Sequence, residues 1–164
     1  MGVKDSILTQ ELVKRNFEYI DGELYWRYMP HPAKNKHAGW IDATGHRSIG
    51  FIGHTFKAHR MIYLYHHGYL PEFIDHIDNN PQNNRIENLR QATAIQNSWN
   101  QKKRKTNTTG VKGVSWNKKA SKWIARCMIN YESHYLGHFE SLEKAQKALI
   151  DFRTKNQGEF ARHE

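Results

Sequence analysis

Apolar and polar residues alternate in two short stretches near the N-terminus. Residues 17–20 (FEYI) and 23–26 (ELYW) have this pattern, and the pair Asp21-Gly22 separates them. An Asp-Gly pair favours the positive φ angles of a two-residue turn. The sequence therefore predicts a β-hairpin here, and the preceding residues 9–15 could form one short helix.

A second hairpin is predicted where residues 47–52 meet residues 55–58 across Gly53-His54. Between the two hairpins, residues 30–45 are rich in turn formers, and we expect them to form a loop that lies against the sheet. No residue in this first third of the chain suggests a chemical role. We interpret residues 1–58 as a small β-sheet scaffold for the segment that follows.

A short apolar helix is predicted at residues 59–67 (HRMIYLYHH), and Gly68 would end it. Its histidines, together with His76, invite a metal-site hypothesis. However, a histidine beside aromatic residues at a helix end is more often a packed or capping residue. His59 and Arg60 are better candidates for contacts with a phosphate group.

The last third of the chain predicts three strands followed by one helix. The strands are expected at residues 111–116, 122–130 and 135–139, and Ser141 would cap a helix at residues 142–157. This order predicts a small antiparallel sheet that packs on a single helix.

Alternate residues of the middle strand in this sheet face opposite ways. Trp123 and Cys127 share one face, which the apolar side of the helix can cover, whereas Arg126 and Met128 share the other face. A three-stranded sheet with one bare, basic face can lie in the major groove of DNA.

The charge of the chain is unevenly distributed. The formal net charge is +9 at pH 7. Residues 1–97 have 11 basic and 10 acidic residues, and residues 98–164 have 14 and 6, which gives +1 and +8. Such an excess favours a polyanionic partner, either nucleic acid or an anionic membrane. Four basic residues begin an extended linker at 102–110 that we expect to follow a phosphate backbone: Lys102, Lys103, Arg104 and Lys105.

Composition also excludes several classes of protein. Cys127 is the one cysteine, so an intrachain disulfide and a multi-cysteine zinc site cannot form. No apolar run approaches the roughly 20 residues that span a bilayer, and the N-terminus lacks the apolar segment of a signal peptide. We therefore expect a protein that acts in the reducing environment of the cytoplasm and has no membrane partner.

The strongest chemical signal lies between residues 73 and 100. Apolar residues lead to Asp75 and His76, and an Asn-rich turn follows at residues 78–81. Residues 83–86 are then predicted to return as a second strand. The segment is thus predicted to form a strand, a turn and a second strand, and the first strand carries an acidic residue and an imidazole.

A helix is predicted next, at residues 94–101, with Thr93 as its N-cap. It would carry Asn97, whose amide oxygen could join the Asp75 carboxylate at one Mg²⁺ ion, while His76 accepts a proton from water. Phosphodiester hydrolysis needs this combination of a metal ion and an activated water. The alternative is an inert Asn-rich loop or a weak calcium site.

Three motifs, Asp75-His76, Asn88-Leu89-Arg90 and Asn97, resemble in order and spacing the HNH family of nucleases, also called the ββα-metal fold. The resemblance implies that His76 is the general base and that Asp75 and Asn97 bind the metal. It also implies that Asn88 braces the loop that holds the base. Asn97 stands where many members have a third His, and a His-Asn-Asn version is similar to the phage-type homing endonucleases. Oxygen donors favour one Mg²⁺ or Mn²⁺ ion per active site over zinc.

The last third resembles the Apetala-two type DNA-binding domain. The positions that carry this resemblance are Gly113-Val114, Trp123, Ala125, Leu136-Gly137, Phe139 and Ala145. By position, the resemblance implies DNA contacts from Lys112, Arg126, Met128 and Tyr135. The family usually has Arg in place of Met128 and Trp in place of Tyr135, so we expect a target sequence other than the plant-type one.

Together these patterns predict an α+β protein with four segments. They are a β scaffold at 1–58, an HNH core at 59–101, a basic linker at 102–110 and a DNA-binding domain at 111–160. The expected function is a homing-type endonuclease that nicks double-stranded DNA as a monomer, without a small-molecule cofactor, and that a phage encodes and its bacterial host expresses. The alternatives are a DNA-binding regulator with an inactive core and a non-specific or RNA-directed nuclease.

Overall fold

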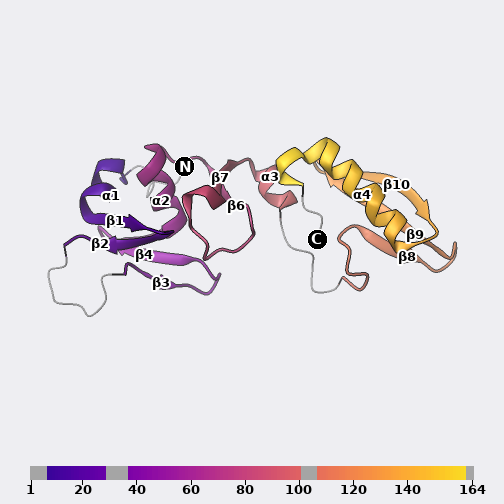
Figure 1. The fold of residues 1–164 in the computed structure, drawn as a ribbon, viewed down its shortest axis with the longest axis horizontal. Coiled ribbons are helices and arrows are strands. Elements are labelled where there is room, and N and C mark those ends of the chain that lie inside the picture. Colours follow the sequence, from indigo (N-terminus) through magenta and orange to yellow (C-terminus); the bar gives the residue numbers. More distant parts are fainter. Residues whose placement is uncertain (1–6, 29–36, 101–106, 162–164) are drawn as a thin grey trace. The chain divides into compact units, whose positions relative to one another are not determined.

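The computed structural model describes residues 7–28, 37–100 and 107–161, and it confirms the predicted α+β class. The chain divides into two compact units, Met1–Thr93 and Ala94–Glu164. Figure 1 shows the helices and strands of each unit. Among the described residues, no helix combines the length and the apolarity needed to cross a lipid bilayer. The predicted division into a scaffold, a nuclease core, a linker and a DNA-binding domain stays a prediction.

The first unit begins with the predicted helix and hairpin. Helix α1 (Gln10–Asn16) has Thr9 as its N-cap, and the Thr9 hydroxyl accepts a hydrogen bond from a backbone N–H of the first turn. Strands β1 (Phe17–Ile20) and β2 (Glu23–Trp26) pair antiparallel. Both residues of the Asp21-Gly22 turn have positive φ, as the sequence predicts.

The second sheet has one strand more than predicted. Strands β3 (Trp40–Ile41), β4 (Arg47–Phe51) and β5 (His54–Lys57) pair in that order. The prediction of a loop over the whole of 30–45 is therefore wrong at β3, where two residues pair with β4; residues 29–36 lie outside the described part. The β4–β5 turn is formed by Ile52-Gly53, both with positive φ, one residue earlier than predicted.

The remaining elements of the first unit carry the chemical motif. Helix α2 (Ala58–His67) ends at Gly68, which has a φ of 77° and donates its N–H to a carbonyl of the last turn. Strand β6 (Phe73–His76) pairs with β7 (Leu89–Ala92). The second strand was predicted at 83–86, which is wrong.

The turn between β6 and β7 is longer than a hairpin turn. A 3₁₀ helix, η1 (Ile86–Asn88), precedes β7. Side chains and backbone groups of residues 78–84 hydrogen-bond within the turn instead of pairing with β6. This local bonding competes with the strand ladder, and the return strand begins at Leu89, six residues later than predicted.

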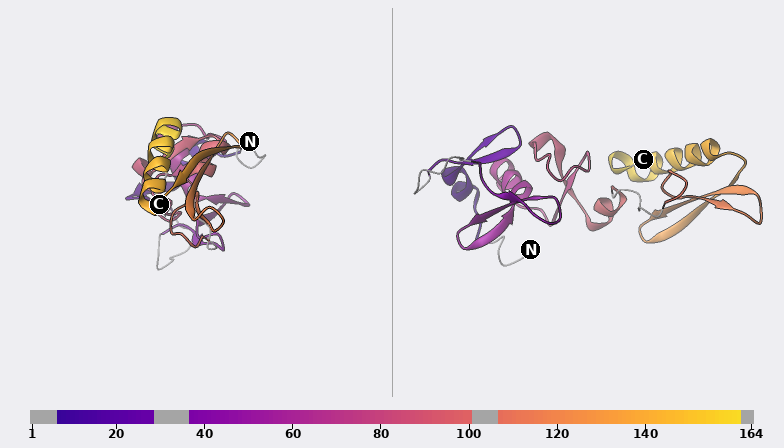
Figure 2. Two further views of the ribbon diagram at one scale, coloured as in Figure 1. Left: turned by 90° about the vertical axis from the view of Figure 1, so that its right-hand side faces the viewer. Right: turned by 90° about the horizontal axis from the view of Figure 1, so that it is seen from below.

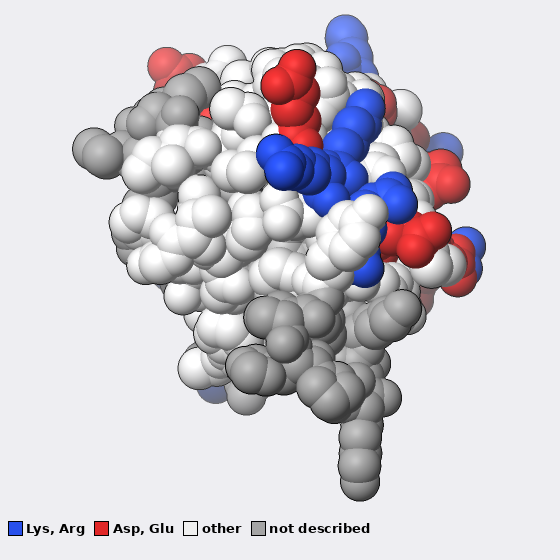
Figure 3. All heavy atoms as spheres, turned by 90° about the vertical axis from the view of Figure 1, so that its left-hand side faces the viewer, with Lys and Arg blue, Asp and Glu red and all other residues white. Residues whose placement is uncertain are grey.

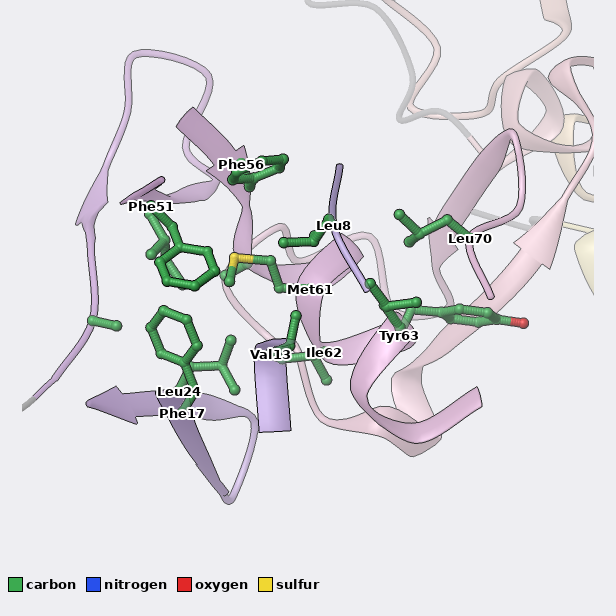
Figure 4. Close-up of a cluster of buried hydrophobic side chains, with 14 of the residues drawn as sticks. Leu8, Val13, Phe17, Leu24, Phe51, Phe56, Met61, Ile62, Tyr63 and Leu70 are labelled. Atoms are coloured by element: carbon green, nitrogen blue, oxygen red, sulfur yellow. The ribbon is translucent and has the colours of Figure 1, made fainter. Parts of the chain in front are cut away.

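One apolar core joins all parts of the first unit. Figure 4 shows side chains from β1, β2 and α2 pointing toward one another, among them Phe17, Leu24 and Met61, which have no exposed surface. Ile74 on β6 and Leu89 on β7 belong to the same cluster. Each large buried side chain stabilises the fold by about 1.5–3 kcal/mol. The scaffold strands and the motif-bearing strands therefore fold around common side chains.

In its described residues, the second unit contains one sheet and three helical segments. They are α3 (Ala94–Trp99), β8 (Val114–Asn117), β9 (Lys122–Ile129), β10 (Glu132–Phe139), α4 (Leu142–Gln157) and η2 (Gly158–Phe160). The strand order is β10-β9-β8, and all pairs are antiparallel. Strand β8 begins three residues later than predicted. Strand β10 begins three residues earlier than predicted, because Asn130 and Tyr131 form a tight turn with positive φ.

Helix α4 covers one face of this sheet, as the sequence predicts (Figure 2, right). Ser141 caps it, and its hydroxyl accepts a hydrogen bond from the backbone of Lys144. Ala125 of β9 and Leu149 of α4 have no exposed surface. Arg126 lies on the opposite, exposed face of β9.

Candidate active site

Asp75 and His76 end strand β6 and are both nearly buried, with 5% and 8% of their surface exposed. Register with β7 sets Asp75 opposite Arg90 and His76 opposite Leu89. Buried polar side chains need partners, and those partners define the site.

The Asp75 carboxylate is paired with Arg90. Its Oδ2 atom accepts from Arg90 Nε at 2.9 Å and from Arg90 Nη2 at 2.8 Å. The Arg90 side chain is only 13% exposed. The guanidinium therefore fixes the orientation of the carboxylate before any ligand is bound.

The His76 imidazole is held from the turn that follows it. Its Nε2 atom lies 3.0 Å from the side-chain Oδ1 of Asn84, and Asn84 is 1% exposed. The sequence did not single out Asn84, because one asparagine among several in a turn looks like a turn former.

Asn88 bonds to both sides of the same turn. Its Nδ2 donates to the Asn83 carbonyl oxygen at 2.7 Å and to Asp78 Oδ1 at 2.9 Å, and its Oδ1 accepts from the Asp78 backbone N–H at 3.1 Å. Burial raises the pKa of Asp78, but hydrogen bonds from Asn83, the Asn80 backbone and Asn88 outweigh it, so the net pKa is lowered. This geometry is what a bracing role for Asn88 requires.

Two further histidines lie beside His76, and we call His46, His59 and His76 the imidazole cluster. Ring centroids are 5.1 Å apart for His59 and His76, 5.8 Å for His46 and His76, and 5.4 Å for His46 and His59. Burial lowers the pKa of both His46 and His59, and the neighbouring His76 lowers each further. The lowered pKa values favour the neutral form of the His46 and His59 rings at pH 7.

His46 reaches the cluster from the loop between β3 and β4, and a polar network holds that loop. Thr44 Oγ1 donates to Asp42 Oδ1 at 2.6 Å and lies 2.9 Å from His46 Nδ1. Ser48 Oγ and Lys57 Nζ donate to the other Asp42 oxygen. No sequence pattern pointed to His46, because it lies 30 residues before His76, between the predicted loop at 30–45 and the predicted strand at 47–52.

His59 and Arg60, the two residues predicted to contact a phosphate group, both have contacts within the first unit. His59 belongs to the imidazole cluster, and its Nδ1 atom is buried without a hydrogen-bond partner among the described residues. Arg60 Nη1 donates to the Glu72 carbonyl oxygen at 3.2 Å. Contact of either residue with a phosphate stays a prediction.

A resident metal cage is not formed by the described side chains. Among them, no group of three or more His, Cys, Asp or Glu side chains could hold a metal ion. Mg²⁺ in nucleic-acid enzymes commonly uses one or two carboxylates, with water and substrate phosphates as the other ligands. The Asp75 carboxylate fits such a shared site as a single oxygen donor. Asn97, the second predicted ligand, lies on α3 in the second unit, and its role stays a prediction.

The predicted DNA-reading residues lie around one face of the second unit. Lys112, Arg126 and Met128 line a cleft of about 380 Å³, together with Arg153. Tyr135 is the cross-strand partner of Arg126 and is 53% exposed. The four basic residues of the linker, Lys102, Lys103, Arg104 and Lys105, lie outside the described residues.

Arg153 is a buried charged residue that the sequence pattern did not reveal, because it falls within an ordinary helix. It is 5% exposed, and its Nη2 donates to the Lys112 carbonyl oxygen at 2.6 Å. Lys112 Nζ in turn donates to the Trp99 carbonyl oxygen at 3.1 Å. Hydrogen bonds thus hold two of the cations that line the cleft, Lys112 and Arg153.

The first unit presents a different electrostatic surface. Figure 3 shows a face on which Lys and Arg side chains lie beside Asp and Glu side chains, with large uncharged areas between them. Residues 1–97 have nearly equal numbers of basic and acidic residues, which agrees with this view. A strong sequence-independent attraction for a polyanion is therefore expected from the second unit.

Known proteins and one family model are similar in sequence to this chain. A family model described as HNH endonuclease matches residues 56–99, which include Asp75, His76, Asn84 and Asn88. Protein 3.8 of Escherichia phage T7 is 36% identical over 110 residues, which cover 65% of this chain and 88% of that protein. An uncharacterized HNH endonuclease of Acanthamoeba polyphaga mimivirus is 32% identical over 133 residues, covering 79% of this chain and 68% of that protein. No solved structure matches the chain.

The paired strands, the braced turn and the buried histidine define a nuclease core of the ββα class. The chain belongs to the HNH endonuclease family. Family membership indicates a nuclease that acts on DNA. The matched family segment ends at residue 99, so the likeness of the last third to an Apetala-two type domain stays a prediction.

Proposed function

We propose that this protein is a site-directed DNA endonuclease of the homing type that hydrolyses a phosphodiester bond with His76 as general base. The observation that carries the proposal is the buried His76 imidazole at the end of β6, held by Asn84 in a turn that Asn88 braces. A general base must be neutral and fixed within reach of its water, and this arrangement provides a fixed ring.

In the mechanism, His76 accepts a proton from the water that attacks phosphorus in line with the leaving 3′ oxygen. Asp75, held by Arg90, would bind one Mg²⁺ or Mn²⁺ ion, and Asn97 would add an amide oxygen. When bound, the ion supplies Lewis-acid stabilisation of the charge on the phosphate. Asn88 keeps the turn closed, so the base does not move away from the water.

We further propose that the second unit and the linker hold the duplex. The bare face of β9 and β10 would read DNA through Lys112, Arg126, Met128 and Tyr135, and the linker cations would contact phosphates. Replacing Arg126 with Ala should weaken binding by about 1–3 kcal/mol if Arg126 contacts a base. Fluorescence anisotropy with the target duplex measures this, with Lys119→Ala as the control for loss of one exposed charge. Equal affinities of the two variants would place the reading face elsewhere.

One active site per chain makes a nick the expected product of a monomer. A double-strand break would need two chains or two successive nicks. The phage relative suggests that a phage encodes the protein and that it acts in the cytoplasm of the bacterial host.

The test is cleavage of supercoiled DNA that contains the host or phage genome. Wild-type protein and His76→Ala are incubated with Mg²⁺, with Mn²⁺ and with a chelator. We expect open-circle product that needs both the divalent ion and His76, with DNA affinity of the variant unchanged. Mapping the product ends gives the target site. Equal degradation of unrelated DNA or of RNA would replace site-directed cleavage with a non-specific or RNA-directed nuclease.

A second candidate function is a DNA-binding regulator with an inactive nuclease core. The Arg90–Asp75 ion pair favours it, because the carboxylate expected to bind metal is already paired. This candidate predicts a duplex mobility shift that needs no divalent ion and no strand cleavage with any ion.

A further inference from the structure

Strand β9 extends beyond its partner β8 in the second unit, and the cleft lies beside the part that extends. Strand β8 pairs with β9 as far as Ala125. The next residue, Arg126, donates its backbone N–H to the Gly113 carbonyl oxygen at 2.8 Å. Beyond this bond, β9 continues to Ile129 and pairs with β10 on its other side. The cleft of about 380 Å³ follows this edge of β9, where Met128 lines it.

The hydrogen-bonding pattern of β9 turns the Met128 backbone toward this edge. Ile129 and Glu132 flank the two-residue turn of the β9–β10 hairpin, so they form a hydrogen-bonded pair. Hydrogen-bonded and non-hydrogen-bonded pairs alternate along an antiparallel ladder, and Met128 therefore directs its N–H and C=O away from β10. Among the described residues, no backbone group on that side accepts from this N–H. The edge thus offers one donor and one acceptor to a ligand.

Gln157 brings a poorly paired amide into the same cleft. Its side chain is 7% exposed and lines the cleft from the last turn of α4. With the described residues, the amide has a single contact, from Nε2 to Cys127 Sγ at 4.0 Å, and sulfur is a weak acceptor. Such an amide costs free energy unless a ligand completes its hydrogen bonds. An amide has a donor and an acceptor side by side, and this pair matches the edge of a nucleobase.

The charge and size of the cleft favour an anionic ligand with a flat apolar part. Three cations line the cleft, Lys112, Arg126 and Arg153, and none of the described lining residues is acidic. The Arg126 guanidinium has no hydrogen bond or ion pair with the described residues. Trp99 and Met128 also line the cleft and offer apolar surface on which a base can stack. Sites for small ligands occupy roughly 300–1,000 Å³, so a cleft of about 380 Å³ fits one nucleotide and not a base pair.

We propose that this cleft binds a single unstacked nucleotide: Arg126 contacts its phosphate, and the Gln157 amide and the Met128 backbone hydrogen-bond the edge of its base. The nucleotide is either an extrahelical one of the DNA held by the second unit or a free nucleoside monophosphate. The first source rests on the proposed function, and the second does not. A bare strand edge also fits an extended peptide, but the excess of cations favours the nucleotide.

The first arm of the experiment tests free nucleotides on the full-length protein. NMR spectra of the ¹⁵N-labelled protein are recorded as dAMP, dGMP, dCMP or dTMP is added, and separately with inorganic phosphate. We expect saturable shifts of the Met128 backbone amide and the Gln157 side-chain amide. The affinity for at least one nucleotide should exceed that for inorganic phosphate by about 10-fold or more, because the base adds stacking.

Variants of one helix position test the role of the amide. Gln157→Leu keeps most of the volume and removes the amide, and it should weaken nucleotide binding by about 10-fold. Gln157→Glu keeps the shape and adds a charge that repels the phosphate, so it should show at least the same loss and serves if the Leu variant does not fold. The matched control is Asn156→Leu, which changes the adjacent, exposed amide and should bind as wild type does.

The second arm tests DNA without knowledge of the target site. Two duplexes of one sequence are compared by fluorescence anisotropy, one fully paired and one with a single bulged 2-aminopurine, a fluorescent analogue of adenine. We expect about 10-fold tighter binding of the bulged duplex, because its extra base is already unpaired, and quenched emission where that base stacks in the cleft. The preference should vanish in Gln157→Leu and persist in Asn156→Leu.

The outcomes separate this proposal from the proposed function. A preference for the bulge that depends on Gln157 supports DNA as the source, and nucleotide shifts without such a preference support a free nucleotide. If the protein cuts DNA but the cleft responds neither to nucleotides nor to the bulge, the nucleotide site is wrong while the nuclease stands. Shifts with a Val-Glu repeat peptide in place of nucleotides would also overturn the proposal. If wild-type protein neither binds nor cuts DNA, the proposed function fails, and the first arm still decides what the cleft binds.

Discussion

Asp75 and Arg90 meet across two strands, and they form an ion pair in a nearly buried place. A carboxylate that is removed from water is costly when it loses its cation, because the attraction to the cation offsets the lost hydration. The site is therefore stable as a paired set of groups, and single changes should have large effects.

Replacing Arg90 with Met keeps most of the side-chain volume and removes the charge. We expect the free energy of unfolding at pH 8 to fall by about 3 kcal/mol, since the nearly buried Asp75 carboxylate loses the charge of this cation. Urea denaturation measures the change. The control is Arg85→Met, which breaks the Arg85–Asp21 pair whose side chains are 55% and 66% exposed and should cost less than about 1 kcal/mol. Similar losses in the two variants would mean that burial does not strengthen the pair.

The imidazole cluster predicts how stability depends on pH. Burial, and then His76 and His46, lower the pKa of His59 well below its ordinary value. The unfolded chain therefore takes up a proton near pH 6.5 that the folded protein does not bind. Stability from this group is complete above that pH and falls as the pH drops through the histidine range, by at most about 1.4 kcal/mol per pH unit.

Denaturation of wild type and His59→Gln at a series of pH values between 7.5 and 5 checks this prediction. The decline of the unfolding free energy should be shallower in His59→Gln. The hydrogen bond from Lys57, followed by those from Ser48 and Thr44, lowers the pKa of Asp42, so this carboxylate stays ionised over the whole range and does not contribute to the slope. Parallel pH curves would show that His59 is protonated equally in both states.

Residues could be predicted from sequence where a local motif marks them. Asp75, His76 and Asn88 stand at fixed spacings within one short segment, and the turn geometry follows from asparagine chemistry. Asn84 and His46 could not be predicted in the same way. The role of Asn84 depends on which of several asparagines is buried, and that of His46 on how a distant hairpin folds back.

At the scale of elements, the spacing of apolar residues and the capping residues predicted most of the hairpins and helices. The wrong predictions of strand position occur where side chains compete with strand pairing for backbone hydrogen bonds. The return strand β7 starts at Leu89 because Asp78, Asn80 and Asn83 bond within the turn. Strand β3 was missed because two residues are too few to show alternation. Its pairing with β4 instead depends on a close approach of two backbones at Gly39.

Gly39 has a φ of +86°, and an added Cβ would lie 2.2 Å from the Ser48 carbonyl oxygen. Gly39→Ala should therefore lower the free energy of unfolding by about 2 kcal/mol or more, through both the φ angle and the clash. Gly53→Ala is the matched control, since its φ is +75° with no atom within 4 Å of the added Cβ. That variant should cost about 1 kcal/mol. Thermal unfolding gives both values, and equal costs would contradict a tight contact at Gly39.

At the scale of the whole molecule, the described residues form two apolar clusters, which have no residue in common. The first centres on Phe17, Met61 and Leu89, and the second on Ala125 and Leu149. The second cluster was predicted from the sequence, because the alternate apolar residues of the strand and the apolar side of the helix mark the same interface. It did not predict that the scaffold and the nuclease strands have a common core, since this depends on long-range packing.

Substitutions in the two clusters should affect different unfolding transitions. Met61→Ala should destabilise the first unit, and Leu149→Ala the second, each by about 2–5 kcal/mol, because both side chains have no exposed surface. Residue-resolved hydrogen exchange assigns each loss to its unit. If either change lowers protection in both units equally, the chain unfolds as one cooperative body.

The family segment begins at residue 56, within strand β5, and this has a consequence for how such genes can recombine. A gene segment that begins at residue 56 would not encode β4, which pairs with β5, and would not encode His46 of the imidazole cluster. A transplanted cassette would arrive with an unpaired strand edge and an incomplete set of imidazoles. Gene segments that are exchanged successfully between nucleases should therefore include the hairpin that precedes the motif. The segment that must be inherited together is thus longer than the segment that the family model matches.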